Sequence, residues 1–95
     1  MLISIIYNLK DIHADHLLEN KWQPYAEGVE SAWNAYNSII MLAPLNDIED
    51  RVKMRLALAY ADRENANNNA EKAFQTGMID FYEYIMDYEW GWKWI

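Results

Sequence analysis

The sequence has 95 residues, of which 53% are hydrophobic and 15% aromatic, and its formal net charge is −7. This length predicts one domain, and the apolar content excludes an intrinsically disordered chain. The absence of cysteine excludes disulfides and thiolate metal sites. The negative charge disfavours direct binding to nucleic acids and to anionic membranes, because both attract basic surfaces.

The N-terminal segment has two interpretations. Its apolar residues recur at helical spacing, which predicts a helix from about Ile3 to Asn20. Residues 2–8 are also rich in β-branched side chains, so a short strand is the alternative, although we favour the helix. The segment lacks the basic region and cleavage-site pattern of a signal peptide, and no stretch approaches the roughly 18 apolar residues of a membrane span. We therefore expect a cytoplasmic protein, acting in the host cytoplasm if a phage encodes it.

A second helix is predicted between the two prolines. Pro24 suits the first turn of a helix, where its missing N–H costs little. Pro44 disfavours helical geometry in the residue before it, so the helix should end near Leu42 or Ala43. The apolar positions follow the helical period: Val29, Ala32, Trp33, Tyr36, Ile39 and Ile40.

Residues 46–64 form the next predicted helix. Asn46 is a suitable N-cap, and the first turn is acidic, as the helix dipole favours. Glu49 and Lys53 form an acid-before-base pair at i,i+4 spacing. Two apolar stripes run along this helix, which predicts that it touches neighbours on two sides and lies centrally. One stripe is Ile48, Val52, Leu56 and Ala59, and the other is Met54, Leu58 and Ala61.

The last predicted helix follows an asparagine-rich turn and starts near Asn68 or Asn69. Gly77 lies inside it and is the position at which the helix is expected to kink or split, if it does so at all. Gly91 is the expected C-terminal cap, with the helix ending near Tyr88 to Trp90. Its apolar stripe follows the helical period: Ala70, Ala73, Phe74, Met78, Phe81, Ile85 and Tyr88.

Together these elements predict an all-α fold, a small single-domain bundle of about four helices over residues 1–95.

An aromatic C-terminal tail occupies about residues 89–95. Its tryptophans alternate (Trp90, Trp92 and Trp94), and the tail has two interpretations: it packs on the protein's own core or it binds a partner. We expect Trp90 and at least one other tryptophan to contact the folded body. The alternation is also compatible with a strand that pairs with residues 2–8.

Part of the chain resembles the helical hairpins of tetratricopeptide repeats. The resemblance is carried by Ala57, Tyr60, Ala70 and Phe74, and by Pro44 at the close of the preceding stretch. At most one and a half repeats would fit, whereas such arrays need about three. The resemblance therefore implies a helical hairpin and does not assign the chain to the family.

The sequence offers little for catalysis. His13 and His16 are the only histidines, and a di-iron bundle would need such clusters on two helices together with further carboxylates. No glycine-rich phosphate loop is present. We therefore expect a protein that is not an enzyme, with no metal and no cofactor.

The charge distribution suggests a binding function. Residues 73–95 carry four acids and one lysine, and these acids alternate with aromatic residues. Asp80, Glu83 and Asp87 fall on one face of the predicted helix. Aromatic anchors within a charged rim are typical of protein interfaces. The predicted partner-binding residues are Asp80, Glu83, Tyr84, Asp87, Glu89, Trp92 and Trp94. The alternative is that the aromatics cover the core and the acids are its solvated side.

We therefore expect a small acidic inhibitor that occupies a basic, nucleic-acid-binding surface of a larger protein. Carboxylates one turn apart on a helix can imitate the charge spacing of a nucleic-acid backbone. In overall character, though through no shared motif, the chain is similar to phage-encoded anti-restriction and anti-CRISPR proteins. The alternative function is a self-associating structural or adaptor module, with the aromatic tail buried between copies of a homo-oligomer.

Overall fold

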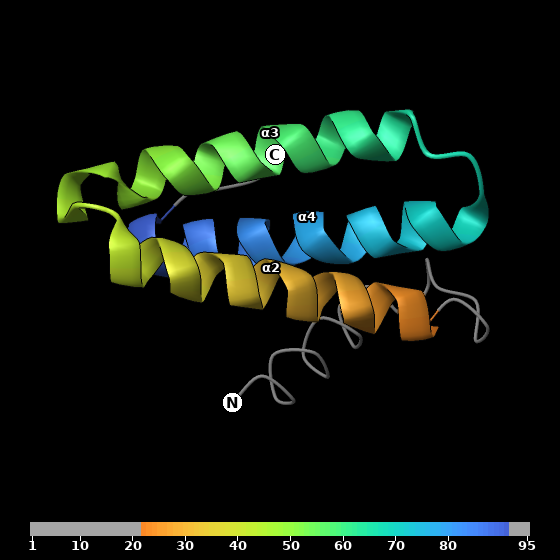
Figure 1. The fold of residues 1–95 in the computed structure, drawn as a ribbon, viewed down its shortest axis with the longest axis horizontal. Helices are drawn as coiled ribbons and strands as arrows, with labels where there is room; N and C mark the ends of the chain where they lie inside the picture. Colours follow the sequence, from red (N-terminus) through yellow and green to blue (C-terminus); the bar gives the residue numbers. More distant parts are fainter. Residues whose placement is uncertain (1–21, 92–95) are drawn as a thin grey trace.

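The computed structural model describes residues 22–91, and these residues form an all-helical fold. Helix α2 spans Trp22–Leu42, α3 spans Ile48–Glu64 and α4 spans Asn69–Trp90, with a 3₁₀ turn at Leu45–Asp47. Consecutive helices run in opposite directions, so α2 and α4 share one direction (Figure 1). The small helical fold is confirmed with three helices in the described region. The predicted helix from Ile3 to Asn20 and its strand alternative lie outside it.

The boundary between α2 and α3 confirms one prediction and corrects another. Helix α2 ends at Leu42, as Pro44 predicts. Asn46, however, is not the N-cap of α3, because it lies inside the 3₁₀ turn. The cap position is Asp47, which has helical dihedral angles and makes no side-chain cap bond. A capping side chain needs extended backbone geometry, and the turn that runs directly into α3 does not provide it.

Both ends of α4 are capped as the sequence predicts. The Asn68 side chain accepts a 2.8 Å hydrogen bond from the Glu71 N–H, and the Glu71 carboxylate accepts one of 3.0 Å from the Asn67 N–H. These two bonds resemble a capping box. Gly91 has a φ of 67° and its N–H donates to the carbonyls of Met86 and Asp87, which closes the helix in the left-handed geometry that glycine tolerates.

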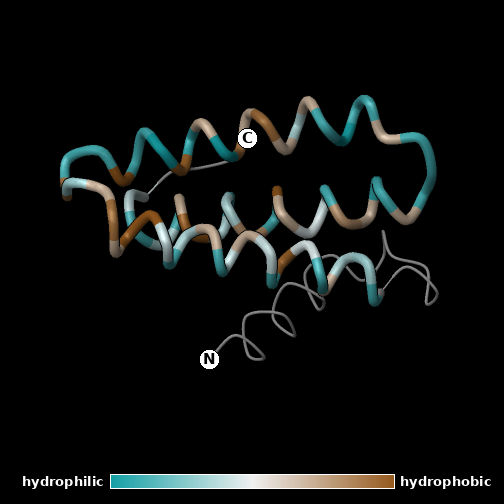
Figure 2. The backbone as a smooth tube through the Cα atoms, viewed as in Figure 1, coloured by the Kyte–Doolittle hydropathy of each residue, from teal (hydrophilic) through white to brown (hydrophobic). Residues whose placement is uncertain are grey.

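The central helix of the described bundle is α4. It packs most extensively against α2 and also packs along α3, whereas α2 and α3 touch only a little. The prediction that the helix over residues 46–64 is central is therefore wrong. Figure 2 shows the corresponding difference in composition, since the chain is mostly hydrophilic along α3 and carries more hydrophobic residues along α2 and α4.

Two glycines set the distance between α2 and α4. A Cβ on Gly28 would overlap the Phe74 carbonyl oxygen and lie 2.9 Å from its carbon. A Cβ on Gly77 would overlap the Tyr25 carbonyl oxygen in the same way. Helix α4 continues through Gly77 without a break. The helix is therefore not split at Gly77, and this glycine serves close helix packing.

The core lies along this contact and is rich in aromatic side chains. Phe81 is fully buried and meets Trp33, Tyr36 and Tyr82 edge to face, each with ring centroids 6.0 Å apart. Such geometry adds about 0.5–1.5 kcal/mol per pair beyond area burial. Trp90 packs against the same core, which confirms the predicted contact. The buried apolar residues are Tyr25, Val29, Ala32, Tyr36, Ile39, Val52, Leu56, Ala59, Ala73, Ile79, Phe81, Tyr82, Ile85 and Met86.

Candidate functional site

Asp80 does not belong to an exposed acidic face. Its side chain is 7% exposed, and it accepts a 2.7 Å hydrogen bond from the hydroxyl of the fully buried Tyr25. Burial and the carboxylate together raise the pKa of Tyr25 far above its usual value, which keeps the phenol protonated as a donor. Our expectation of Asp80 as an exposed binding carboxylate is therefore wrong. Helical spacing grouped it with Glu83 and Asp87 but could not say which way that face points.

Glu83 is half-buried and engaged within the protein. Its carboxylate accepts a hydrogen bond from the hydroxyl of Tyr60 on α3, and the Arg63 guanidinium lies 5.1 Å from the Tyr60 ring centroid. Partial burial and this bond raise the pKa of Tyr60 to about 12. Glu83 thus links α4 to α3, and its predicted role in partner binding stays a prediction.

The last turn of α4 is where acidic and aromatic side chains reach solvent together. Asp87, Tyr88 and Glu89, which we call the acidic turn, are all exposed, and Tyr88 is 74% exposed. The Tyr88 ring stacks on the half-buried Tyr84 at 6.2 Å and 11°. At 100° per residue, Asp87 and Glu89 point to opposite sides of the helix. The two carboxylates therefore flank Tyr88 and do not form a row.

The electrostatics of the acidic turn favour an external cation. A helix C-terminus carries partial negative charge, which lysine or arginine in the last turn normally offsets. Helix α4 has no basic residue in its last turn and two acids instead. Two of its terminal carbonyls are already bonded to the Gly91 N–H. Asp87 and Glu89 therefore remain as the groups that could receive an arginine or lysine, with Tyr88 as an aromatic face beside them.

The rest of the predicted site is only partly described. Trp92 and Trp94 lie outside the described residues, and so do His13 and His16. Tyr88, which helical spacing assigned to the apolar stripe, is instead the most exposed aromatic of α4. Helical spacing alone did not separate it from Phe81 and Ile85, because exposure depends on which side chains the neighbouring helices cover.

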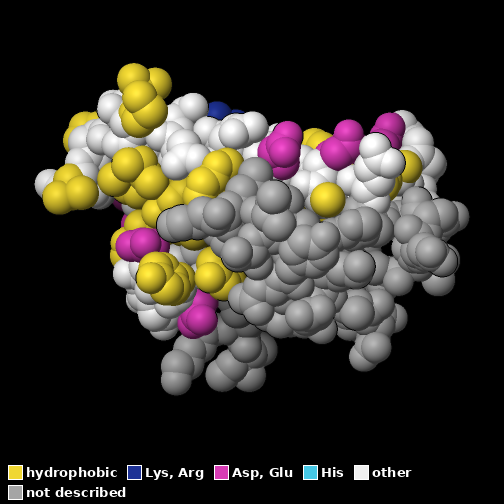
Figure 3. Space-filling view, turned by 90° about the horizontal axis from the view of Figure 1, so that it is seen from below, with side chains coloured by type: hydrophobic (Ala, Val, Ile, Leu, Met, Phe, Trp, Pro, Cys, Tyr) yellow, Lys and Arg dark blue, Asp and Glu magenta, His cyan; other side chains and the backbone are white. Residues whose placement is uncertain are grey.

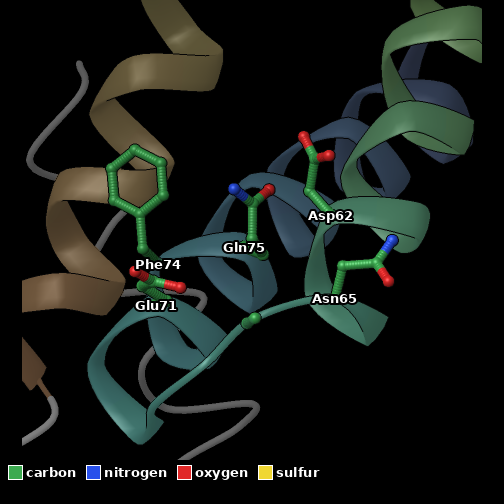
Figure 4. A pocket seen from close by; sticks show the side chains of 6 residues that line it. Asp62, Asn65, Glu71, Phe74 and Gln75 are labelled. Carbon is green, nitrogen blue, oxygen red and sulfur yellow. The ribbon is translucent and has the colours of Figure 1, made fainter.

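A pocket of about 270 Å³ opens where α3 turns into α4. Figure 4 shows Gln75 in its centre with Asp62 and Asn65 on one side and Glu71 and Phe74 on the other. Glu71 and Asn65 cap their own helices, since Glu71 accepts the Asn67 N–H and the Asn65 amide donates to the Ala61 carbonyl. These polar groups thus hold the turn together, and the lining contains no histidine, serine or lysine. We assign the pocket no chemistry.

Within residues 22–91, no group of three or more histidine and acidic side chains could hold a metal ion. No described helix is long and apolar enough to cross a membrane. No protein-family model, curated protein or solved structure matches the chain.

The sequence did not reveal one hydrophobic surface. Met41, Leu42 and Leu45 are each more than 80% exposed, and they surround the connection from α2 to α3. Figure 3 shows hydrophobic side chains gathered at that end of the molecule. The helical period assigned none of these three residues to an apolar stripe, because they lie at the end of α2 and in the turn that follows.

Proposed function

We propose that the protein is a non-enzymatic binding protein that uses the acidic turn of α4 to engage a basic surface of a larger protein. The observation that carries this proposal is the exposure of Asp87, Tyr88 and Glu89 at a helix C-terminus without a basic residue in its last turn. An arginine of the partner can pair with either carboxylate and stack on the tyrosine ring at the same time.

The partner surface that best fits this chemistry is one built for nucleic acid. Such surfaces carry clustered lysine and arginine side chains that are spaced for phosphates. A protein of net charge −7 is steered towards them by its overall field. The protein would then act as an inhibitor that competes with nucleic acid. Asp80 is excluded from the contact by its burial, so the binding carboxylates are Asp87 and Glu89, with Trp92 and Trp94 retained as predicted anchors.

Capture from a lysate of the cells that naturally contain the protein tests this proposal. We expect the wild-type chain to retain a basic protein that double-stranded DNA or raised salt releases, because charge pairing weakens with ionic strength. The double variant Asp87→Asn/Glu89→Gln should bind the captured partner about tenfold or more weakly. Tyr88→Ala should weaken it as well.

The matched control is Glu27→Gln/Glu30→Gln. Both residues are exposed on α2, and the change removes the same amount of charge at a different place. If the two double variants lose affinity equally, net charge alone explains binding and the acidic turn is not the site. A partner that DNA cannot displace would contradict the competitive mechanism while leaving a binding function in place.

A further inference from the structure

The solvent-facing side of α3 carries an apolar strip that the bundle does not use. Met54, Ala57, Leu58 and Ala61 follow one another at three- and four-residue steps, so they share a face. All four are exposed, with Met54 at 64% and Leu58 at 53%. The buried residues of α3 lie on the opposite side: Val52, Leu56 and Ala59. The second apolar stripe of the sequence therefore faces away from α2 and α4.

Charged residues border this strip in a self-complementary order. On one side Arg51 precedes Asp62, and on the other Lys53 precedes Glu64, in each case by eleven residues or three helical turns. Lys53 also pairs with Glu49 in its own helix, at 3.2 Å. Within the described residues no ion pair joins Arg51 or Asp62 to another side chain. We therefore use the flank formed by Arg51 and Asp62, and not the one with Lys53, to infer how a partner helix is oriented.

We propose that α3 pairs with the α3 of a second copy of this chain, antiparallel about a two-fold axis. Such an axis places each flank of one helix beside the same flank of the other, with the direction reversed. Arg51 then faces Asp62 of the second copy, and the reverse contact forms as well. The apolar strip has its midpoint between Ala57 and Leu58, and the two charged flanks have theirs one residue to either side, so a single axis lies within about 1.5 Å of all three along the helix.

The charges also explain why a second copy is the occupant. Helix α3 has four acids and four bases and thus no net charge, whereas α4 has five acids and one lysine. Two copies of a chain with net charge −7 repel each other least where α3 meets α3. A parallel two-fold arrangement would instead bring opposite flanks together at the same level, with Arg51 beside Lys53 and Asp62 beside Glu64 of the second copy, so that charges of like sign would meet. A single helix pair is a small interface, so the dimer is expected at the weak, reversible end of the range.

Sedimentation of the purified full-length chain over a concentration series tests the proposal. We expect a reversible monomer–dimer equilibrium, which Met54→Glu or Leu58→Glu shifts at least tenfold towards monomer. Both residues are exposed, so the thermal midpoint of dilute protein should not move. The matched control is Tyr88→Glu, which puts the same charge on an exposed residue of α4 and should leave the dimer intact. A chain that is monomeric at every concentration overturns the proposal, as does a dimer that survives both α3 variants.

Exchange of the flanking charges tests the orientation. Arg51→Glu and Asp62→Lys should each weaken the dimer, because each places two residues of like charge opposite each other across the two-fold axis. The double variant should restore it, and an equimolar mixture of the single variants should form a heterodimer. No restoration in the double variant means that these residues do not face each other, which overturns the antiparallel pairing.

The absence of cysteine from the chain permits a direct distance test. Ala57 lies close to the proposed axis, so Ala57→Cys should form a disulfide-linked dimer readily in a glutathione buffer. Ala61→Cys lies one turn further along, about 10 Å out of register with its counterpart, which is beyond disulfide reach. Equal cross-linking of both variants would indicate parallel helices and overturn the geometry. Because Met54 and Tyr88 lie on different helices, failure of this dimer leaves the proposed function untouched.

Discussion

Helices α3 and α4 are neighbours of similar length, yet they have opposite relations to the core. From Ile79 to Met86, α4 buries side chains on nearly every side, including the carboxylate Asp80. Helix α3 buries only one stripe, formed by Val52, Leu56 and Ala59. An apolar stripe was present on both faces of α3, and only one was used. The number of apolar stripes therefore did not indicate which helix is central.

The close approach of α2 to α4 accounts for the difference. Gly28 and Gly77 let the two backbones come into contact, and the aromatic side chains around Phe81 fill the space beside that contact. Helix α3 then covers one side of α4 and needs only one face to do so. Close packing at two glycines thus decides which helix becomes the centre of the bundle.

The largest loss of stability is expected when a methyl group is added where α2 crosses α4. Gly28→Ala or Gly77→Ala places a Cβ into a backbone carbonyl that cannot rotate away. Although alanine gains about 1 kcal/mol over glycine inside a helix, overpacking should produce a net loss of about 3 kcal/mol or more. Denaturant unfolding measures it. Ala57→Leu on the outer face of α3 is the control, and a Gly77→Ala protein as stable as wild type would contradict the close contact.

The next largest effect is expected at the buried hydrogen bond between α2 and α4. Tyr25→Phe removes the bond donated to Asp80 and should cost about 1–3 kcal/mol. Tyr82→Phe is the matched control, because the Tyr82 hydroxyl is buried on α4 without a hydrogen-bond partner. Its removal should be neutral or stabilising. Equal losses in the two variants, measured by thermal unfolding, would show that ring packing and not the Asp80 bond stabilises this site.

A smaller, pH-dependent effect is expected where α3 meets α4. Tyr60 has a pKa of about 12 in the folded protein, against about 10 when unfolded. The folded state therefore retains a proton that the unfolded state loses, so this contribution is complete below pH 10 and disappears as pH rises towards 12. At pH 11 it should be under about 1 kcal/mol, because the side chain is partly exposed. Tyr60→Phe should show a correspondingly flatter stability profile between pH 9 and 11.

The smallest effect is expected on the outer face of α3. Met54→Glu should change the free energy of unfolding by no more than about 0.5 kcal/mol, since the side chain is mostly exposed. The measurement needs dilute protein, so that association does not contribute. A loss of several kcal/mol would show that this face is covered within the monomer, and it would remove the contrast with α4.

Local sequence signals predicted the helix boundaries well. Pro44, Asn68 and Gly91 each stand within two residues of the end of a helix, because proline geometry, side-chain capping and left-handed glycine involve only a few neighbouring residues. The failure at Asn46 follows the same rule, since the 3₁₀ turn around it rearranged the local backbone that a cap requires. Fold class also followed from periodicity alone.

The exposure of the predicted partner-binding residues followed from the sequence only in part. Asp87 and Glu89 are exposed as acidic residues should be, but Asp80 is buried and Glu83 is bonded to Tyr60. Helical spacing states which side chains share a face. Whether a neighbouring helix covers that face depends on contacts more than fifty residues apart, such as the one between Tyr25 and Asp80.

The sequence by itself therefore determined that α2, α3 and α4 are helices and, except at Asn46, about where they begin and end. Only the tertiary structure decided that α4 is central, that Gly28 and Gly77 are contact points and that Asp80 is internal. The physical reason is range: capping and helical propensity act within one turn of the chain, whereas burial is set by how closely separate helices can approach.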